Sequence, residues 1–156
     1  MSQKMKLRKE QENSCKILLV DDNSCLLEVV YQILGSKDYQ VTTATSGEGA
    51  IEELHKQFFD LVITDLNMGE VNGIEVLKKA KELNPETIGI IMTANHDLPF
   101  YLEELRLDVC DCLLKPFDAS DLLERVFQCL NKRKSRGSNR RSTTHSRTLH
   151  DRSLNV

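Results

Sequence analysis

The segment KILLVDDNSCLLEVVYQIL, residues 16–34, decides the fold class. Its first part, Lys16–Val20, is apolar after the lysine, which is typical of a strand buried on both faces. The acidic pair Asp21-Asp22 follows, and apolar side chains then recur at helical spacing as far as Leu34. The segment therefore predicts a buried strand followed directly by a helix.

The same alternation of a short apolar run and a longer helix-period stretch continues along the chain. The further predicted strands are residues 39–44, 61–64, 88–93 and 111–114. The further predicted helices begin near residues 46, 74, 97 and 118. Five strands alternating with five helices predict an α/β fold, a doubly wound parallel sheet with helices on both faces and the strand order 2-1-3-4-5.

Length and charge indicate how the chain is divided. Residues 13–130 hold 9 Lys or Arg against 21 Asp or Glu, whereas residues 131–156 hold 8 basic residues against one acid. The basic segment has too few apolar residues to fold alone. We therefore expect a charged amino-terminal arm at residues 1–13, one domain at residues 14–131, and a basic, disordered tail at residues 132–156, part of which could extend the last helix.

The composition also limits the classes of function. The tail is too short, and has the wrong periodicity, for a helix-turn-helix, so no DNA-binding domain is expected. It could instead contact an anionic partner, such as nucleic acid, an anionic membrane or the acidic domain itself. No apolar run approaches the roughly 20 residues that span a bilayer, and the amino terminus lacks the apolar stretch of a secretory signal. These features predict a cytoplasmic protein.

The cysteines form no metal-ligand or disulfide motif. They are odd in number and none are spaced as CxxC; their positions are 15, 25, 110, 112 and 129. In a reducing compartment we expect them to be reduced and mostly buried, and to behave as small hydrophobic residues.

Chemically active residues follow the predicted strands. Asp21 and Asp22 come after the first strand and Asp65 after the third, while Thr93 and Lys115 end the fourth and fifth. Because function gathers at the carboxyl ends of strands in such a sheet, we expect these side chains to share one shallow cleft. Crowded carboxylates repel each other unless a cation joins them, and an all-oxygen cluster suits Mg²⁺.

Four motifs in this order resemble the receiver domains of two-component response regulators, over about residues 14–131. The motifs are Asp21-Asp22, the segment DLNMGEVNG at 65–73, Thr93-Ala94 and Lys115-Pro116-Phe117. The resemblance implies a flavodoxin-like receiver fold and a signalling switch that catalyses only its own phosphorylation and dephosphorylation.

The resemblance also assigns roles at the site. Asp65 would accept a phosphoryl group from a sensor histidine kinase or a phosphotransfer protein. Asp22 and Asp65 would bind Mg²⁺ directly, Asp21 mainly through water, and Asn67 through its backbone carbonyl. Thr93 would contact the phosphoryl group.

Lys115 would contact the same group, and the signal would reach a surface formed by the fourth helix, the fifth strand and the fifth helix. Phosphorylation would change which downstream protein this surface binds, and a phosphorylation-dependent homodimer is also compatible with the resemblance.

Two positions depart from the family pattern. Gly69 stands where receiver domains usually have proline, and Cys112 stands where they have an aromatic residue that moves with the threonine. Tyr101 could supply a ring from elsewhere. Cys110 stands two residues before Cys112, on the same face of the predicted strand, and the pair is either a redox or metal pair or two ordinary small residues.

Two other functions stay open at the level of sequence. A phosphatase of the haloacid dehalogenase superfamily also uses a strand-end aspartate, but it has its acids two residues apart after the first strand, whereas Asp21 and Asp22 are adjacent. The missing aromatic residue leaves room for a receiver-like interaction module that is never phosphorylated.

Overall fold

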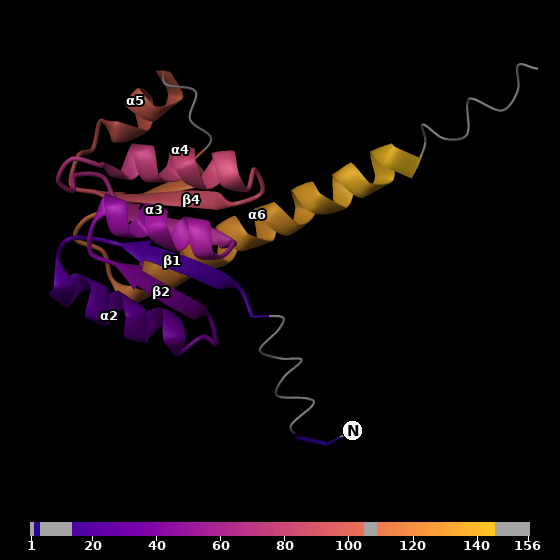
Figure 1. The fold of residues 1–156 in the computed structure, drawn as a ribbon, viewed down its shortest axis with the longest axis horizontal. Coiled ribbons are helices and arrows are strands. Elements are labelled where there is room, and N and C mark those ends of the chain that lie inside the picture. The colour runs from indigo at the N-terminus through magenta and orange to yellow at the C-terminus, as the bar shows by residue number, and fades with distance from the viewer. Residues whose placement is uncertain (1, 4–13, 105–108, 146–156) are drawn as a thin grey trace, which may run out of the picture.

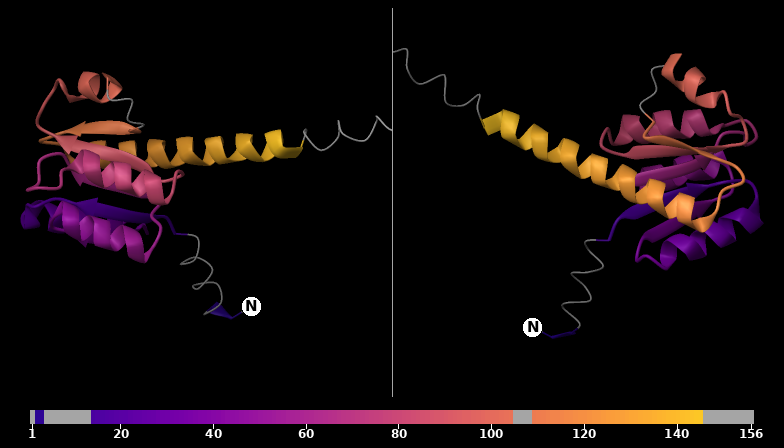
Figure 2. Two further views of the ribbon diagram at one scale, coloured as in Figure 1. Left: turned by 45° about the horizontal axis from the view of Figure 1, so that its top comes forward. Right: turned by 180° about the vertical axis from the view of Figure 1, so that it is seen from behind.

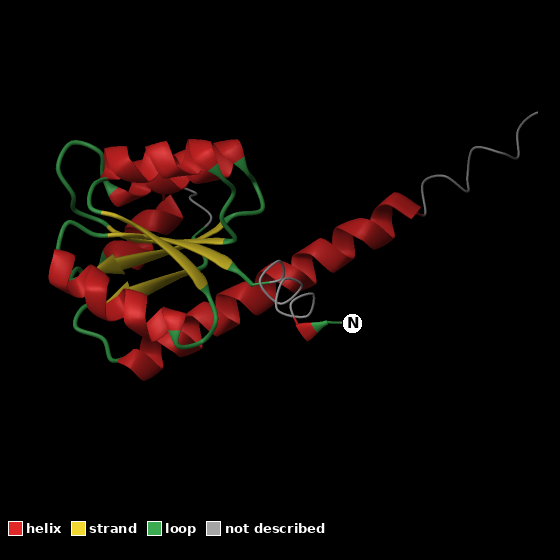
Figure 3. Cartoon of the chain, turned by 60° about the horizontal axis from the view of Figure 1, so that its bottom comes forward, coloured by secondary structure: helices red, strands yellow, loops and turns green. Residues whose placement is uncertain are grey.

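A computed structural model of the chain describes residues 2–3, 14–104 and 109–145. Its centre is one five-stranded parallel sheet in the order β2-β1-β3-β4-β5, with helices on both faces (Figures 1 and 3). The strands are β1 (Lys16–Val20), β2 (Gln40–Ala44), β3 (Leu61–Asp65), β4 (Ile88–Thr93) and β5 (Asp111–Leu114). The helices are α2 (Ser24–Gly35), α3 (Gly47–Lys56), α4 (Gly73–Leu83), α5 (Leu98–Glu104) and α6 (Ala119–His145). The predicted fold class and strand order are confirmed.

Burial on both faces explains the uninterrupted apolar strands. Along β1, Ile17 and Leu19 pack into a core that includes residues of α2 and α6, and Leu18 and Val20 pack into a second core with α3, α4 and α5. All four side chains are fully buried. The sheet is therefore the rigid middle layer that fixes where each strand ends.

Polar side chains fix where the helices begin. The side chain of Asn23 accepts hydrogen bonds from the backbone N–H groups of Cys25 and Leu26 at the start of α2. Asn72 and Glu75 form a reciprocal capping box at the start of α4. Such caps satisfy N–H groups that have no partner within the helix, so they place the strand-to-helix loops that carry the site.

The last helix continues into the basic segment. The expected domain boundary at residue 131 lies inside α6, which continues to His145 and projects beyond the sheet (Figure 2). Arg133 ties this helix to the domain, because its Nε donates to the carbonyl of Glu86 at 2.9 Å and its Nη1 lies 2.5 Å from Asp60 Oδ1. Residues 146–156 and most of the arm at 1–13 lie outside the described residues.

The prediction of reduced cysteines is wrong for one pair. Cys110 and Cys129 are joined by a disulfide, while Cys15, Cys25 and Cys112 are free. The alternative in which Cys110 and Cys112 form a redox or metal pair is also contradicted, because Cys110 is bonded to Cys129 and Cys112 is free. Cys110 precedes β5 and packs with the α2–α6 core, whereas Cys112, inside the strand, packs with the opposite core. The two residues do not share a face because the alternation of β5 starts only at Asp111.

Candidate functional site

Four of the predicted site residues meet at the carboxyl edge of the sheet. Asp21 directly follows β1, Asp65 ends β3, and Thr93 ends β4. Lys115 directly follows β5, and its backbone N–H donates to the carbonyl of Thr93 at 2.8 Å. The peptide bond between Lys115 and Pro116 is cis. The strand order therefore brings together residues that are up to 94 positions apart in the sequence.

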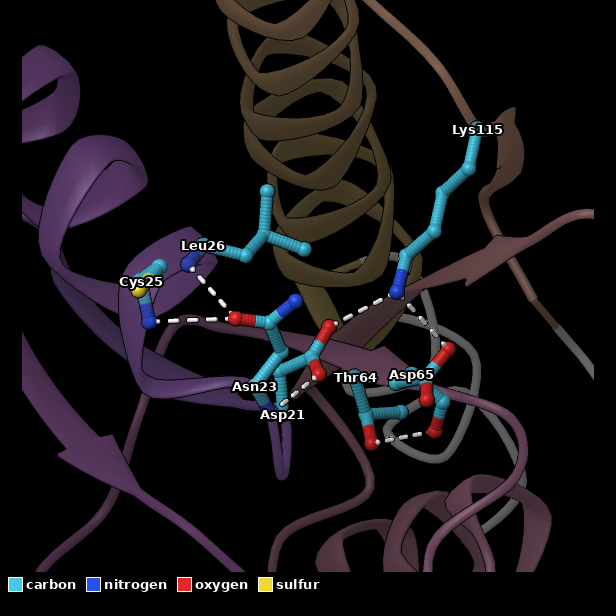
Figure 4. Close-up of polar contacts among 7 residues, drawn as sticks. All are labelled: Asp21, Asn23, Cys25, Leu26, Thr64, Asp65 and Lys115. Carbon is cyan, nitrogen blue, oxygen red and sulfur yellow. Dashed lines mark hydrogen bonds and ion pairs between the residues drawn. The ribbon is translucent and has the colours of Figure 1, made fainter.

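The ammonium group of Lys115 lies between two carboxylates (Figure 4). Its Nζ is 2.8 Å from Asp21 Oδ2 and 3.2 Å from Asp65 Oδ1. The other oxygen of Asp21 accepts a hydrogen bond from the backbone N–H of Asn23 at 2.9 Å. Asp21 is 1% exposed, so these contacts compensate for the burial of its charge. The loop after β1 thus supplies both Asp21 and the backbone N–H of Asn23 that orients its carboxylate.

Burial and neighbouring charges change the acidity of this cluster. Burial raises the pKa of Asp65, and the nearby charge of Asp21 adds to the rise, although the hydrogen bond from Lys115 opposes it. Burial alone would lower the pKa of Lys115, but its contacts with Asp21 and Asp65 leave it above the ordinary value. One lysine therefore neutralises the acids only in part.

The acids are close enough to share one cation. Asp21, Asp22 and Asp65 each offer an oxygen, and these oxygens lie within 4.8 Å of one another. Within the part of the chain that the structure describes, this is the one such cluster of potential ligands. Its ligands are all carboxylate oxygens, which suit a hard divalent cation such as Mg²⁺. The residues present fit that ion.

The predicted residues Thr93 and Asn67 are not among these acids. Thr93 is 2% exposed, and its Oγ1 accepts a hydrogen bond from the backbone N–H of Asn95 at 3.0 Å, which fixes the hydroxyl at the end of β4. Asn67 lies two residues beyond Asp65 with an exposed side chain. The use of its backbone carbonyl as a metal ligand stays a prediction.

Two glycines shape the loop after Asp65. Only Gly69 was singled out from the sequence, as a departure from the family's proline. Gly73 begins α4 so close to β3 that a Cβ there would lie 2.2 Å from the Asp65 carbonyl oxygen. Gly69 has φ +49°, in the left-handed region that proline cannot adopt. The departure from the family's proline is therefore a change in backbone conformation. The close approach of Gly73, in contrast, has no signal in the sequence beyond the pair Asn72-Gly73 at the start of the helix.

Comparison with known proteins gives the family. A family model described as "Response regulator receiver domain" matches residues 17–127, well over half of the chain. The chain belongs to the response regulator receiver family. This result agrees with the predicted resemblance, and the acids, threonine and lysine of the site all lie inside the matched residues.

Two similar relatives among curated proteins are larger than this chain. "Transcriptional regulatory protein ZraR" of Escherichia coli K12 is 39% identical over 106 residues, which cover 68% of this chain and 24% of the relative. "Transcriptional regulatory protein DltR" of Streptococcus agalactiae is 32% identical over 111 residues, covering 71% of this chain and 50% of the relative. This chain therefore spans a quarter to a half of the length of these two relatives.

Solved structures of receiver domains agree with the fold. A CheY-like receiver domain from Methanospirillum hungatei has a TM-score of 0.74 and 27% identity, covering 80% of this chain and 99% of that chain. The chemotaxis response regulator CheY4 of Vibrio cholerae has a TM-score of 0.69 and 27% identity, covering 75% of this chain and 99% of that chain. No helix among the described residues is long and apolar enough to cross a membrane.

Proposed function

We propose that this receiver is a phosphorylation-controlled switch in which Asp65 accepts a phosphoryl group. The observation that carries the proposal is the placement of Lys115 between Asp21 and Asp65, at 2.8 and 3.2 Å, beside a cluster of three acids. The donor is a sensor histidine kinase or a phosphotransfer protein in the cytoplasm, the partners and location expected for this family. The downstream protein is not identified by the site.

The acids and the lysine have different roles in phosphoryl transfer. Asp65 ends a rigid buried strand, so its carboxylate is held in place to attack phosphorus. Asp21, Asp22 and Asp65, with the backbone carbonyl of Asn67, would hold Mg²⁺. When bound, this ion would neutralise charge on the phosphoryl oxygens.

Lys115 holds a second positive charge beside the acceptor oxygen, where it would pair with the transferred group. The Thr93 hydroxyl accepts one hydrogen bond through an oxygen lone pair, so its hydrogen can be donated to a phosphoryl oxygen. Addition of a doubly charged group would draw Lys115 away from Asp21. That rearrangement is the local event from which a signal starts.

The proposed output surface is formed by α5, β5 and α6. It is supported by two exposed apolar side chains, Leu114 of β5 at 37% and Phe127 of α6 at 60%. Exposed apolar side chains on these elements are suited to a protein partner. The side chain of Tyr101, considered as a substitute for the family's aromatic residue, lies outside the described residues, so how Cys112 transmits the signal stays open to experiment.

The test is the intact mass of the full chain after incubation with acetyl phosphate and Mg²⁺. We expect one added phosphoryl group, which is lost when EDTA is present and lost in the Asp65→Asn variant. Asp38→Asn is the matched control, because Asp38 has φ +63°, which asparagine also tolerates, and it lies in the turn before β2, at the opposite edge of the sheet.

Other outcomes separate the alternatives. No added mass, together with no binding of beryllofluoride, would favour an interaction module that is never phosphorylated. The half-buried Cys112, which stands in place of the family's aromatic residue, supports this alternative. Repeated turnover of a phosphomonoester substrate would instead indicate a phosphatase.

A further inference from the structure

The disulfide lies far from the proposed phosphorylation site. Cys110 stands immediately before β5, and Cys129 lies in α6. A cavity of about 90 Å³ opens beside them, and its lining includes Ile88, the first residue of β4. The cavity therefore lies at the amino-terminal edge of the sheet, opposite Asp65, and the proposed function does not use it.

The cavity that exposes the disulfide has a basic lining. Its charged lining residues among those described are Lys81, Lys132, Arg133 and Arg136. Arg133 is partly neutralised by Asp60, at 2.5 Å, whereas the side chain of Lys132 is exposed. Several cations around one small opening attract an anion and stabilise negative charge that develops there.

The two cysteines of the disulfide differ in exposure. Cys129 is 1% exposed, whereas Cys110 is half-buried. Both residues line the cavity, and Cys110 is the more exposed target for a thiolate that enters it. Attack on the sulfur of Cys110 makes Cys129 the leaving group, and its thiolate departs beside the basic side chains.

We infer that the Cys110–Cys129 pair is a thiol–disulfide exchange site for small anionic thiols of the glutathione class. In the first step the thiolate forms a bond to the sulfur of Cys110, the bond to Cys129 breaks, and Cys129 leaves as a thiolate that takes a proton from water. A second thiolate then attacks the sulfur of the small thiol in the mixed disulfide. This step releases the oxidised small molecule and leaves Cys110 reduced, so two thiols are oxidised for each protein disulfide reduced.

The rate of exchange should depend on the charge of the cavity lining, which is not expected of a merely structural disulfide. Substitution of Lys132→Gln removes one charge from the cavity, and we expect it to slow reduction by glutathione about threefold. Reduction by 2-mercaptoethanol should slow less, because this thiol has no charged group besides its thiolate. It therefore reports any change in the reactivity of the disulfide that does not depend on the charge of the reductant. Lys134→Gln is the matched control, because Lys134 is an exposed base on the same helix that does not line the cavity.

The experiment uses the full chain purified in air, with thiols counted by alkylation and intact mass. We expect three free thiols before treatment and five after glutathione, with a transient mixed disulfide that peptide mapping places on Cys110. Five free thiols at the start, a mixed disulfide on Cys129, or equal effects of Lys132→Gln on the two reductants would each overturn the inference.

Discussion

Gly73→Ala tests whether the start of α4 holds Asp65 in place. The added Cβ would lie 2.2 Å from the carbonyl oxygen of Asp65, 3.1 Å from its carbonyl carbon and 3.1 Å from Thr64 Cγ2. Two of these atoms are backbone, so no rotation of a side chain relieves the overlap. Overpacking of this kind typically costs about 1–3 kcal/mol, and because rigid backbone is involved we expect the upper half of that range.

The assay compares urea unfolding and the rate of phosphorylation by acetyl phosphate for the variant and for Gly35→Ala. Gly35 is the matched control, because a Cβ there has nothing within 4 Å. We expect Gly73→Ala to lower both stability and rate, since the chain relieves the overlap by moving the end of β3. If Gly73→Ala is as stable as Gly35→Ala and is phosphorylated at the normal rate, the reasoning from close approach is refuted.

Three further predictions concern charge and the disulfide. Lys115→Met leaves the buried carboxylate of Asp21 without its ion pair, so we expect a loss of about 1–3 kcal/mol in urea unfolding and slower phosphorylation; unchanged values would contradict the geometry. The raised pKa of Asp65 means that the folded protein binds this proton more tightly than the unfolded chain, so metal-free stability falls as pH rises from the ordinary value of 3.8 through the raised one. The stability of Asp65→Asn relative to the metal-free parent should therefore increase over that range, and a constant difference would count against the raised pKa. Reduction of the bond between Cys110 and Cys129, which are separated by 19 positions, should lower stability by about 3 kcal/mol in the chain-entropy model, and identical urea midpoints with and without reductant would show that the bond contributes nothing.

The sequence predicted the sheet and the set of residues at its carboxyl edge because both follow from local signals. Apolar runs of strand length alternate with helical periods, and in a parallel sheet each strand must end at the same edge. The contact between Lys115 and Asp21 did not follow from strand order alone, because β3 and β4 lie between β1 and β5. The distances and the partial neutralisation of Asp65 required side-chain positions.

Features that depend on packing between distant segments were missed. Nothing local shows that Cys110 lies against Cys129, because the pairing depends on where the chain enters β5 relative to α6. The same holds for Gly73, whose need to be glycine comes from a contact with Asp65. How far the last helix extends into the basic segment was left open by the sequence, because the contacts of Arg133 with Glu86 and Asp60 depend on packing against a distant part of the chain.

The position of the phosphoryl group is the most direct test of the central claim. The full chain is phosphorylated with acetyl phosphate and Mg²⁺ and then treated with borohydride, which reduces an aspartyl phosphate to homoserine, and the peptides are sequenced by mass spectrometry. We predict homoserine at position 65 and unmodified aspartate at positions 21 and 22. Homoserine at position 21 or 22 instead, or at no aspartate in protein that gained phosphoryl mass, would contradict the assignment of Asp65 as the acceptor.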